Sequence, residues 1–193
     1  DATNKVAKLV KAAASETWAG VTLDPAGSGA NTVPAIGFGT SKVITLRVYS
    51  PAAGELVMLK VENSTDGAIN MEARATTTKA GAWETLSFNF AAPSAGTYDA
   101  SKTYDRISVF PHFDAKVTAE TVFYIDELNY SAVVSAGGGT SSGTATTVTF
   151  DTAEIKLVAF GALGAEVAAD PVNAANKAAK LMKVAASETW AGV

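Results

Sequence analysis

The residues best suited to chemistry in this sequence are aromatic and polar side chains that alternate with apolar ones along short segments. Sugar binding uses an aromatic face, which stacks on the C–H groups of a sugar ring, and flanking polar groups that hydrogen-bond its hydroxyls. The alternation places such side chains on the outward face of the predicted strands. The candidate sugar-binding residues are Trp18, Arg47, Tyr49, Glu62, Phe110 and His112.

Five of these candidates also have a structural explanation. Trp18 suits a core position as well as a binding face, and Arg47 and Glu62 suit a cross-strand charge ladder worth about 0.2–1 kcal/mol per pair. Phe110 and His112 flank Pro111, which cannot donate a hydrogen bond to a strand ladder. We therefore expect both at an edge or loop near a cleft, or simply at the end of an edge strand.

Catalytic motifs are missing from the sequence. It has no nucleophile elbow, no H-E-x-x-H, no P-loop and no G-x-G-x-x-G at the start of a helix. His112 is the single histidine, and none of the 19 acids stands in a recognisable glycosidase context, which needs two facing carboxylates. We expect a protein that is not an enzyme.

The elements that would position these side chains are strands. Period-2 alternation recurs in VITLRVYS, ELVMLKVEN, INMEARA and WETLSFNF, and turn signals such as NSTDGA and APSAGT separate them. KVAKLVKAAASE has the propensity of a helix, but we interpret it as a strand because the rest of the unit is all-β. The pattern predicts an all-β fold, an antiparallel β-sandwich of the jelly-roll type.

An internal repeat is the strongest signal in the chain. Residues 4–21 and 176–193 are identical at 15 of 18 positions, at an offset of 172, with mismatches Val6/Ala178, Val10/Met182 and Ala12/Val184. The chain therefore contains parts of two copies of one unit. Copy one lacks the segment that corresponds to residues 147–172, and copy two has that segment and little else.

The repeat predicts three regions. Residues 1–130 form a first sandwich repeat that lacks its N-terminal strands, and residues 131–147 form a Gly/Ser/Thr-rich linker. Residues 148–193 hold the N-terminal strands of a second repeat. Because unpaired edges are unfavourable, we expect residues 147–175 to complete this sandwich or that of a neighbouring molecule.

Charge and hydropathy exclude some partners. The net charge is -4, without the basic stripe that nucleic acids or anionic lipids require. No apolar run approaches the roughly 20 residues that span a bilayer.

The chain begins at DATNK, without the positively charged segment followed by an apolar segment that is typical of a signal peptide. We therefore expect a signal peptide to be absent or removed. The absence of cysteine is compatible with either a cytosolic or an exported protein.

The segments NKVAKLVKAAASETWAGVTL, SKVITLRVYSPAAGELVMLKVENSTDGA, AGAWETLSFNF and TVFYIDELNY together resemble a known family. They are similar to jelly-roll carbohydrate-binding modules of the laminarinase-associated, family 4/9-like type, which occur in secreted proteins of marine bacteria. The resemblance implies a secreted or cell-surface module that binds a polysaccharide such as a β-glucan, often with a structural calcium.

The resemblance also suggests which residues would hold calcium. Asp126 in FYIDEL and Asp151 in VTFD are the family-like candidates, on the last and first strands of a unit, although either could be a solvated acid at a strand end. The leading expectation is a non-catalytic carbohydrate-binding module. The alternative is a structural repeat of an extracellular adhesin or filament, in which the partner is a neighbouring copy and the strands exchange between subunits.

Overall fold

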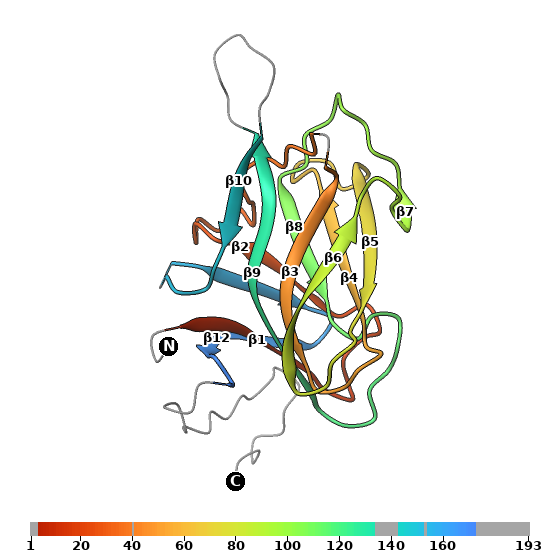
Figure 1. The fold of residues 1–193 in the computed structure, drawn as a ribbon, viewed down its shortest axis with the longest axis vertical. Helices are drawn as coiled ribbons and strands as arrows, with labels where there is room; N and C mark the ends of the chain where they lie inside the picture. Colours follow the sequence, from red (N-terminus) through yellow and green to blue (C-terminus); the bar gives the residue numbers. More distant parts are fainter. Residues whose placement is uncertain (1–3, 40, 134–142, 153, 173–193) are drawn as a thin grey trace.

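The protein is a sandwich of two antiparallel β-sheets (Figure 1). The computed structural model describes residues 4–39, 41–133, 143–152 and 154–172. This part of the chain consists of strands, turns and loops and contains no helix. The prediction of an all-β antiparallel β-sandwich is confirmed.

One sheet, which we call the β9 sheet, is ordered β12-β1-β9-β3-β6, and β10 also pairs with β9. Its strands are β1 (Lys5–Lys11), β3 (Val43–Ser50), β6 (Ala82–Asn89), β9 (Thr121–Val133), β10 (Gly143–Val148) and β12 (Leu163–Ala169).

The second sheet, which we call the β8 sheet, is ordered β11-β2-β8-β4-β5-β7. Its strands are β2 (Gly20–Asp24), β4 (Leu56–Glu62), β5 (Asn70–Thr76), β7 (Ala95–Gly96), β8 (Arg106–Phe110) and β11 (Lys156–Phe160).

The core lies between the two sheets and follows the alternation of the sequence. In β3, Ile44, Leu46 and Val48 are buried, whereas Arg47 and Tyr49 point to the outer face and are half-buried. Burying one such apolar side chain contributes about 1.5–3 kcal/mol. Because side chains alternate across a strand, the same pattern that fills the core leaves every second side chain on an outer face.

The ambiguous segment near the N-terminus is a strand over Lys5–Lys11, as predicted. It lies inside the β9 sheet, where β12 pairs with it along one edge and β9 along the other. Its Ala and Lys content favours a helix only locally, and two rows of interstrand hydrogen bonds outweigh that preference.

The segment after the first repeat completes this sandwich within the same chain. β10 pairs with β9, β11 pairs with β2, and β12 pairs with β1. Val148, Phe150 and Leu163 are buried in the common core. These strands therefore fill both the edge and the core positions that the first repeat leaves open.

The segment predicted as a linker, 131–147, belongs to strands at both of its ends. β9 continues to Val133, and β10 starts at Gly143 opposite it. The threonines of this segment are β-branched and suit a strand, which the Gly/Ser/Thr composition concealed. Residues 134–142 lie outside the described residues.

β9 changes partner halfway along its length. On one edge it pairs with β1 over residues 121–125 and with β10 over residues 128–133. A register shift against β3 falls at the same point, where Glu127 has a φ of 44°. This irregularity re-aims the side chains around Asp126, as bulges commonly do.

Candidate functional site

A groove of about 390 Å³ lies on the outer face of the β8 sheet. We call it the β8 groove. Its lining residues come from β2, β4, β8, β11 and two loops. They are Trp18, Thr22, Asn31, Lys60, Glu62, Arg106, Ser108, Phe110 and Phe160.

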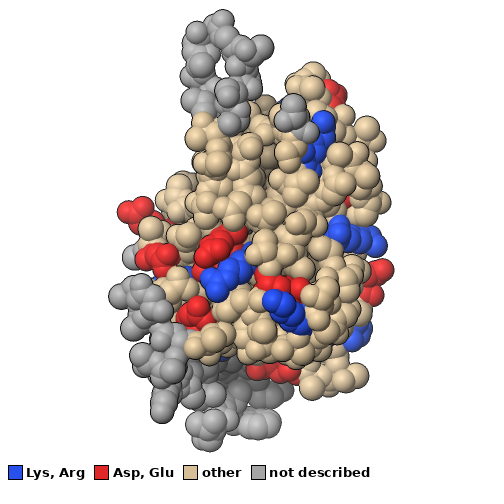
Figure 2. Space-filling view, viewed as in Figure 1, with Lys and Arg blue, Asp and Glu red and all other residues tan. Residues whose placement is uncertain are grey.

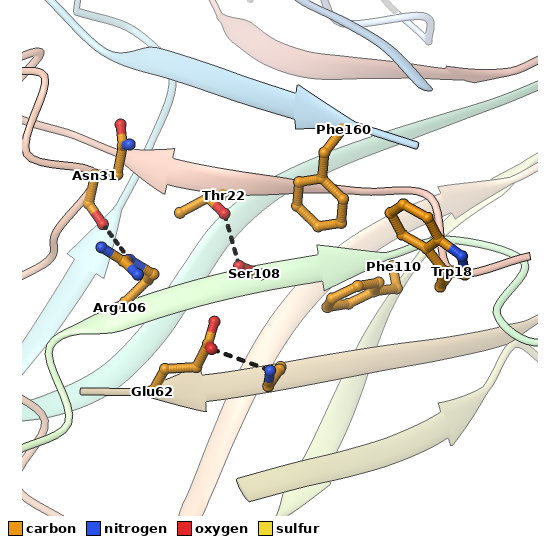
Figure 3. A pocket seen from close by; sticks show the side chains of 9 residues that line it. Trp18, Thr22, Asn31, Glu62, Arg106, Ser108, Phe110 and Phe160 are labelled. Atoms are coloured by element: carbon orange, nitrogen blue, oxygen red, sulfur yellow. Dashed lines mark hydrogen bonds and ion pairs between the residues drawn. The ribbon is translucent and has the colours of Figure 1, made fainter. Parts of the chain in front are cut away.

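The floor of the β8 groove is made of small hydroxyl side chains. Thr22 and Ser108 stand opposite each other on β2 and β8, and their hydroxyl oxygens are 2.8 Å apart. Both side chains are buried, and Figure 3 shows them facing each other across the two strands. On the next strand Lys60 stands opposite Ser108, which extends the polar row across the sheet.

Aromatic rings form one end of the groove (Figure 3). Trp18 is 52% exposed, and its ring stacks on Phe160 at a centroid distance of 6.3 Å and an angle of 17°. Phe160 in turn meets Phe110 at 5.4 Å. Gly20 lies beneath these rings, and a Cβ there would stand 2.8 Å from both Phe110 and Phe160. The missing side chain of Gly20 therefore allows the aromatic rings to approach.

Charged and amide groups form the other end of the groove. The Arg106 guanidinium donates to the carbonyl oxygens of Asn31, at 3.2 Å, and Ser64, at 3.1 Å. Glu62 stands opposite Arg106 in the β4–β8 register, and its carboxylate accepts from the Lys60 ammonium at 3.0 Å. The ends of the groove thus differ in chemistry, and Figure 3 shows the Thr22–Ser108 pair between them.

The loop that carries Asn31 is held by the buried carboxylate of Asp24. Asp24 accepts hydrogen bonds from the backbone amides of Gly29, at 2.7 Å, and Ser28, at 3.3 Å. Burial alone would raise the pKa of Asp24, but these hydrogen bonds and that of the Ser28 hydroxyl outweigh it and hold the pKa below its ordinary value. Asn31 itself has a φ of 58°, which asparagine tolerates better than most residues.

The loop that carries Trp18 is held by a buried lysine. The Lys11 ammonium donates to the carbonyl oxygens of Thr17, Pro111 and His112, at 3.1, 3.4 and 2.7 Å. Burial, assisted by the charge of Lys116, lowers the pKa of Lys11. The contact ties the Trp18 loop to the end of β8, which carries Phe110.

Three of the six predicted binding residues meet in the groove, namely Trp18, Glu62 and Phe110. Trp18 is not a core residue. The expectation of an edge position for Phe110 is wrong, because β8 lies between β2 and β4. Phe110 ends its strand, so the Pro111 that follows removes no ladder hydrogen bond within β8.

Two predicted residues, Arg47 and Tyr49, lie on the opposite face of the molecule. Both belong to β3 of the β9 sheet, where the Arg47 guanidinium stacks over Trp83 at 4.6 Å and the Tyr49 ring packs edge-on against the same tryptophan. Alternation predicted correctly that they point outward. Sequence alone does not tell which sheet a strand joins, so grouping them with Trp18 was wrong.

His112 lies beside the groove but does not line it. It follows β8 with a φ of 46°, and its Nδ1 contacts the Glu55 carboxylate. Its carbonyl oxygen accepts from Lys11. The structure therefore places His112 among the groups that hold the aromatic end of the groove in position.

Sequence reasoning missed Phe160, Arg106, Asn31, Thr22 and Ser108. Phe160 lies in the second repeat, 142 positions after Trp18 in the sequence. The others lie at strand and loop positions that become neighbours only through the pairing of β2, β8 and β4. One usable signal was Gly20 within an apolar strand, because a glycine there often marks the close approach of another group.

Asp126 and Asp151 lie at the corner where β9 changes partner. Asp126 is buried and accepts from the backbone amide of Glu127, at 2.8 Å, and from Asn4, at 3.5 Å, while Asp151 accepts from the backbone amide of Lys5. Burial raises the pKa of Asp126, and the charges of Glu127 and Asp151 add to this rise. Among the described residues no three His, Cys, Asp or Glu side chains form a group that could hold a metal ion.

Charges of both signs are interspersed over the face seen in Figure 2, and neither forms a continuous patch there. No helix in the described ranges is long and apolar enough to cross a membrane. No protein-family model matches the chain, and a search of curated proteins finds no significant match.

Proposed function

We propose that the protein is a non-catalytic, secreted or cell-surface module that binds a neutral polysaccharide such as a β-glucan in the β8 groove. The observation that carries the proposal is Trp18, whose ring is half exposed at the end of a groove with a polar floor. An exposed tryptophan stacked on a second ring offers a flat apolar face beside hydrogen-bonding groups, which is the combination a sugar ring requires.

The groove suits an extended chain rather than a single sugar. Arg106 and Phe110 stand at the two ends of β8, and four steps along a strand span about 13 Å. That length exceeds a single pyranose ring. A chain would stack one ring on Trp18 and place the hydroxyls of the next rings over Thr22, Ser108 and Arg106.

A neutral ligand suits the charges of the groove better than a strongly anionic one. Lys60 is paired with Glu62, the Arg106 guanidinium donates to two backbone carbonyl oxygens, and the protein as a whole carries a net charge of -4. With a single cation beyond the Lys60–Glu62 pair, the groove offers hydrogen bonds to hydroxyls and only a weak attraction for an anionic polymer. Glu62 is the one carboxylate among the described residues that line the groove, whereas glycoside hydrolysis ordinarily uses two.

Affinity electrophoresis in gels that contain laminarin, or other neutral and anionic polysaccharides, tests the proposal. We expect a neutral polysaccharide to retard the protein, and Phe160→Ala to weaken binding about tenfold because Trp18 loses its stacking support. Tyr49→Ala is the matched control, since it removes a ring from the opposite face. Absence of retardation in every gel, or an equal loss with Tyr49→Ala, contradicts the proposal.

We further propose a structural calcium ion at the corner of Asp126 and Asp151. The chemistry of these ligands fits, because calcium binds carboxylate and carbonyl oxygens and would favour the ionised form of the buried Asp126, whose Oδ2 also lies 3.9 Å from the Arg47 guanidinium. The two acids would be direct ligands, with carbonyl oxygens or water completing the shell. Thermal unfolding with calcium and with a chelator should give a higher Tm with calcium, and Asp126→Asn should abolish the difference. Equal Tm values in the unmodified protein count against the ion.

A structural role in an extracellular adhesin or filament is the second candidate. It is supported by the way strands of the second repeat pair with strands of the first, since the same strands could complete a neighbouring molecule. Light scattering at two protein concentrations distinguishes the two. A mass that rises with concentration favours exchange between subunits, and a constant monomer mass contradicts it.

A further inference from the structure

A second hollow, of about 240 Å³, lies where residues next to β6 of one sheet meet residues of β7 of the other sheet. We call it the β7 hollow. β7 is the last strand of the β8 sheet on the side away from β11 (Figure 1), and no residue lines both this hollow and the β8 groove. The hollow is therefore a separate site. Its lining residues are Lys42, Phe90, Ala91, Pro93, Gly96, Thr97 and Tyr98.

The floor of the β7 hollow is a cluster of aromatic rings that belongs to the core. Phe90 is fully buried, and its ring meets that of Phe38 at a centroid distance of 5.5 Å. Tyr98 packs edge-on against Phe38, at 5.3 Å, and stacks on Tyr104, at 6.1 Å. The Tyr104 hydroxyl also accepts a hydrogen bond from the backbone amide of Asp99, at 3.2 Å. Because these rings are held from several sides, the floor keeps its shape without a ligand.

The wall of the hollow, residues 91–97, is fixed by contacts with the backbone of β5. The backbone amide of Ser94 donates to the carbonyl oxygen of Glu72, at 2.7 Å. Gly96 has a φ of 77°, and a Cβ there would stand 2.3 Å from the carbonyl oxygen of Asn70, so a glycine is needed for β7 to lie this close to β5. The hollow is thus preformed, as sites for small ligands usually are.

Lys42 supplies the charge of the hollow. It precedes β3, and its carbonyl oxygen accepts from the backbone amide of Phe90, at 2.7 Å, which fixes the Lys42 backbone beside the floor. Its ammonium lies over the Tyr98 ring, 5.2 Å from the centroid. The residue is half-buried, and no carboxylate of the described residues forms an ion pair with it. A half-buried cation without an acidic partner favours an anionic group on a ligand.

The other lining groups suit the body of a sugar ring. Pro93 and Ala91 offer apolar contacts for C–H groups, and the Thr97 hydroxyl can donate to or accept from a sugar hydroxyl. The volume lies below the about 300 Å³ at which sites for drug-sized ligands begin, so it suits about one ring. None of the described residues that line the hollow is acidic, so none of them repels a carboxylate.

We propose that the β7 hollow binds a single uronic acid ring, with the carboxylate of the sugar on the Lys42 ammonium and its C–H groups against Pro93 and Ala91. This site is independent of the proposed function, because the β8 groove is proposed to take a neutral chain and shares no lining residue with the hollow.

Nuclear magnetic resonance of the backbone amides of the full chain tests the proposal, in titrations with sodium glucuronate, glucose or sodium acetate at equal ionic strength. We expect glucuronate to shift the amide signals of Lys42, Gly96, Thr97 and Tyr98, and to bind at least about tenfold more tightly than glucose or acetate. Lys42→Met should weaken glucuronate binding about tenfold or more, because the carboxylate loses a charge-assisted hydrogen bond. Lys156→Met is the matched control, since it removes the same charge from an exposed site on β11.

Amide signals of the hollow that do not move with glucuronate overturn the proposal. Equal affinity for glucose overturns it because the carboxylate is then not recognised, and equal affinity for acetate overturns it because the ring then contributes nothing. An equal loss in Lys42→Met and Lys156→Met also overturns it, since net charge alone would explain both. The comparison of the three ligands uses the unmodified protein and therefore does not depend on the folding of a variant. Absence of laminarin binding contradicts the proposed function and leaves this result unchanged.

Discussion

Tyr130 illustrates how single buried groups set local stability. Its side chain is 4% exposed, and its hydroxyl has no hydrogen-bond partner among the described residues. Burial accordingly raises the pKa of this phenol. An unsatisfied buried hydroxyl costs free energy that its removal recovers.

We expect Tyr130→Phe to leave the free energy of unfolding unchanged or to raise it by up to about 1 kcal/mol. Urea unfolding monitored by fluorescence measures this. Tyr104→Phe is a useful comparison, because the Tyr104 hydroxyl accepts a hydrogen bond from the backbone amide of Asp99. A loss of more than about 1 kcal/mol in Tyr130→Phe would show that its hydroxyl has a partner.

Asp24 is a buried carboxylate whose hydrogen bonds hold the loop that carries Asn31, one of the residues that line the β8 groove. Its pKa is lowered in the folded state, so the folded protein binds its proton less readily than the unfolded chain. Asp24 therefore contributes stability above its unfolded pKa, near pH 4, and loses that contribution as the pH falls through the folded value.

We expect Asp24→Asn to lower the free energy of unfolding at pH 7 by about 1–3 kcal/mol, and the difference from the unmodified protein to shrink below about pH 4. Denaturant unfolding across pH 2.5–7 gives both quantities. A constant difference over that range would contradict the proposed role of the carboxylate charge.

At the scale of elements, β11, β2 and β8 can lie close together because Gly20 has no side chain. A Cβ at Gly20 would stand 2.8 Å from the carbonyl oxygen of Val109 as well as from two phenylalanine rings. A ring can move, but the backbone of a central strand cannot do so without disturbing its ladder.

We expect Gly20→Ala to destabilise the fold by about 1–3 kcal/mol and to weaken polysaccharide binding as well. Thermal unfolding and affinity electrophoresis measure the two effects. Gly29→Ala serves as a comparison, since nothing lies within 4 Å of a Cβ at that glycine, although its φ of 82° adds backbone strain. Unchanged stability in Gly20→Ala would show that the strands separate easily.

At the scale of the whole molecule, the sandwich needs strands from both repeats. β10, β11 and β12 bring Val148, Phe150, Ile155 and Leu163 into the core. Without them β1, β2 and the end of β9 each lose a neighbouring strand. Unpaired strand edges and a partly exposed apolar core would both lower the stability of the fold.

We expect a chain that ends at residue 142 to lose its cooperative thermal transition, and a chain that ends at residue 172 to keep it. The longer variant retains β10 to β12 and removes only the second copy of residues 4–21. Circular dichroism on heating measures the transition. A cooperative transition in the shorter variant would show that the first repeat folds without the second.

The sequence by itself determined the fold class, the strand pattern and the repeat, because alternation and turn residues are local properties. It also predicted Trp18, Glu62 and Phe110 as candidate binding residues, and the structure brings these three together in the β8 groove. Tertiary structure alone decided that Arg47 and Tyr49 lie on the other sheet and that Phe160 supports Trp18.

The physical reason is that sheet membership depends on pairings between distant segments. The alternation of β3 determines which of its residues point outward, but only its ladders with β6 and β9 determine the face of the molecule on which they lie. Phe160 reaches Trp18 because β11 pairs with β2 and Gly20 leaves space between them. The spacing of residues along the chain does not tell which strands pair with each other. It also does not tell where a missing side chain, as at Gly20, leaves space for a ring.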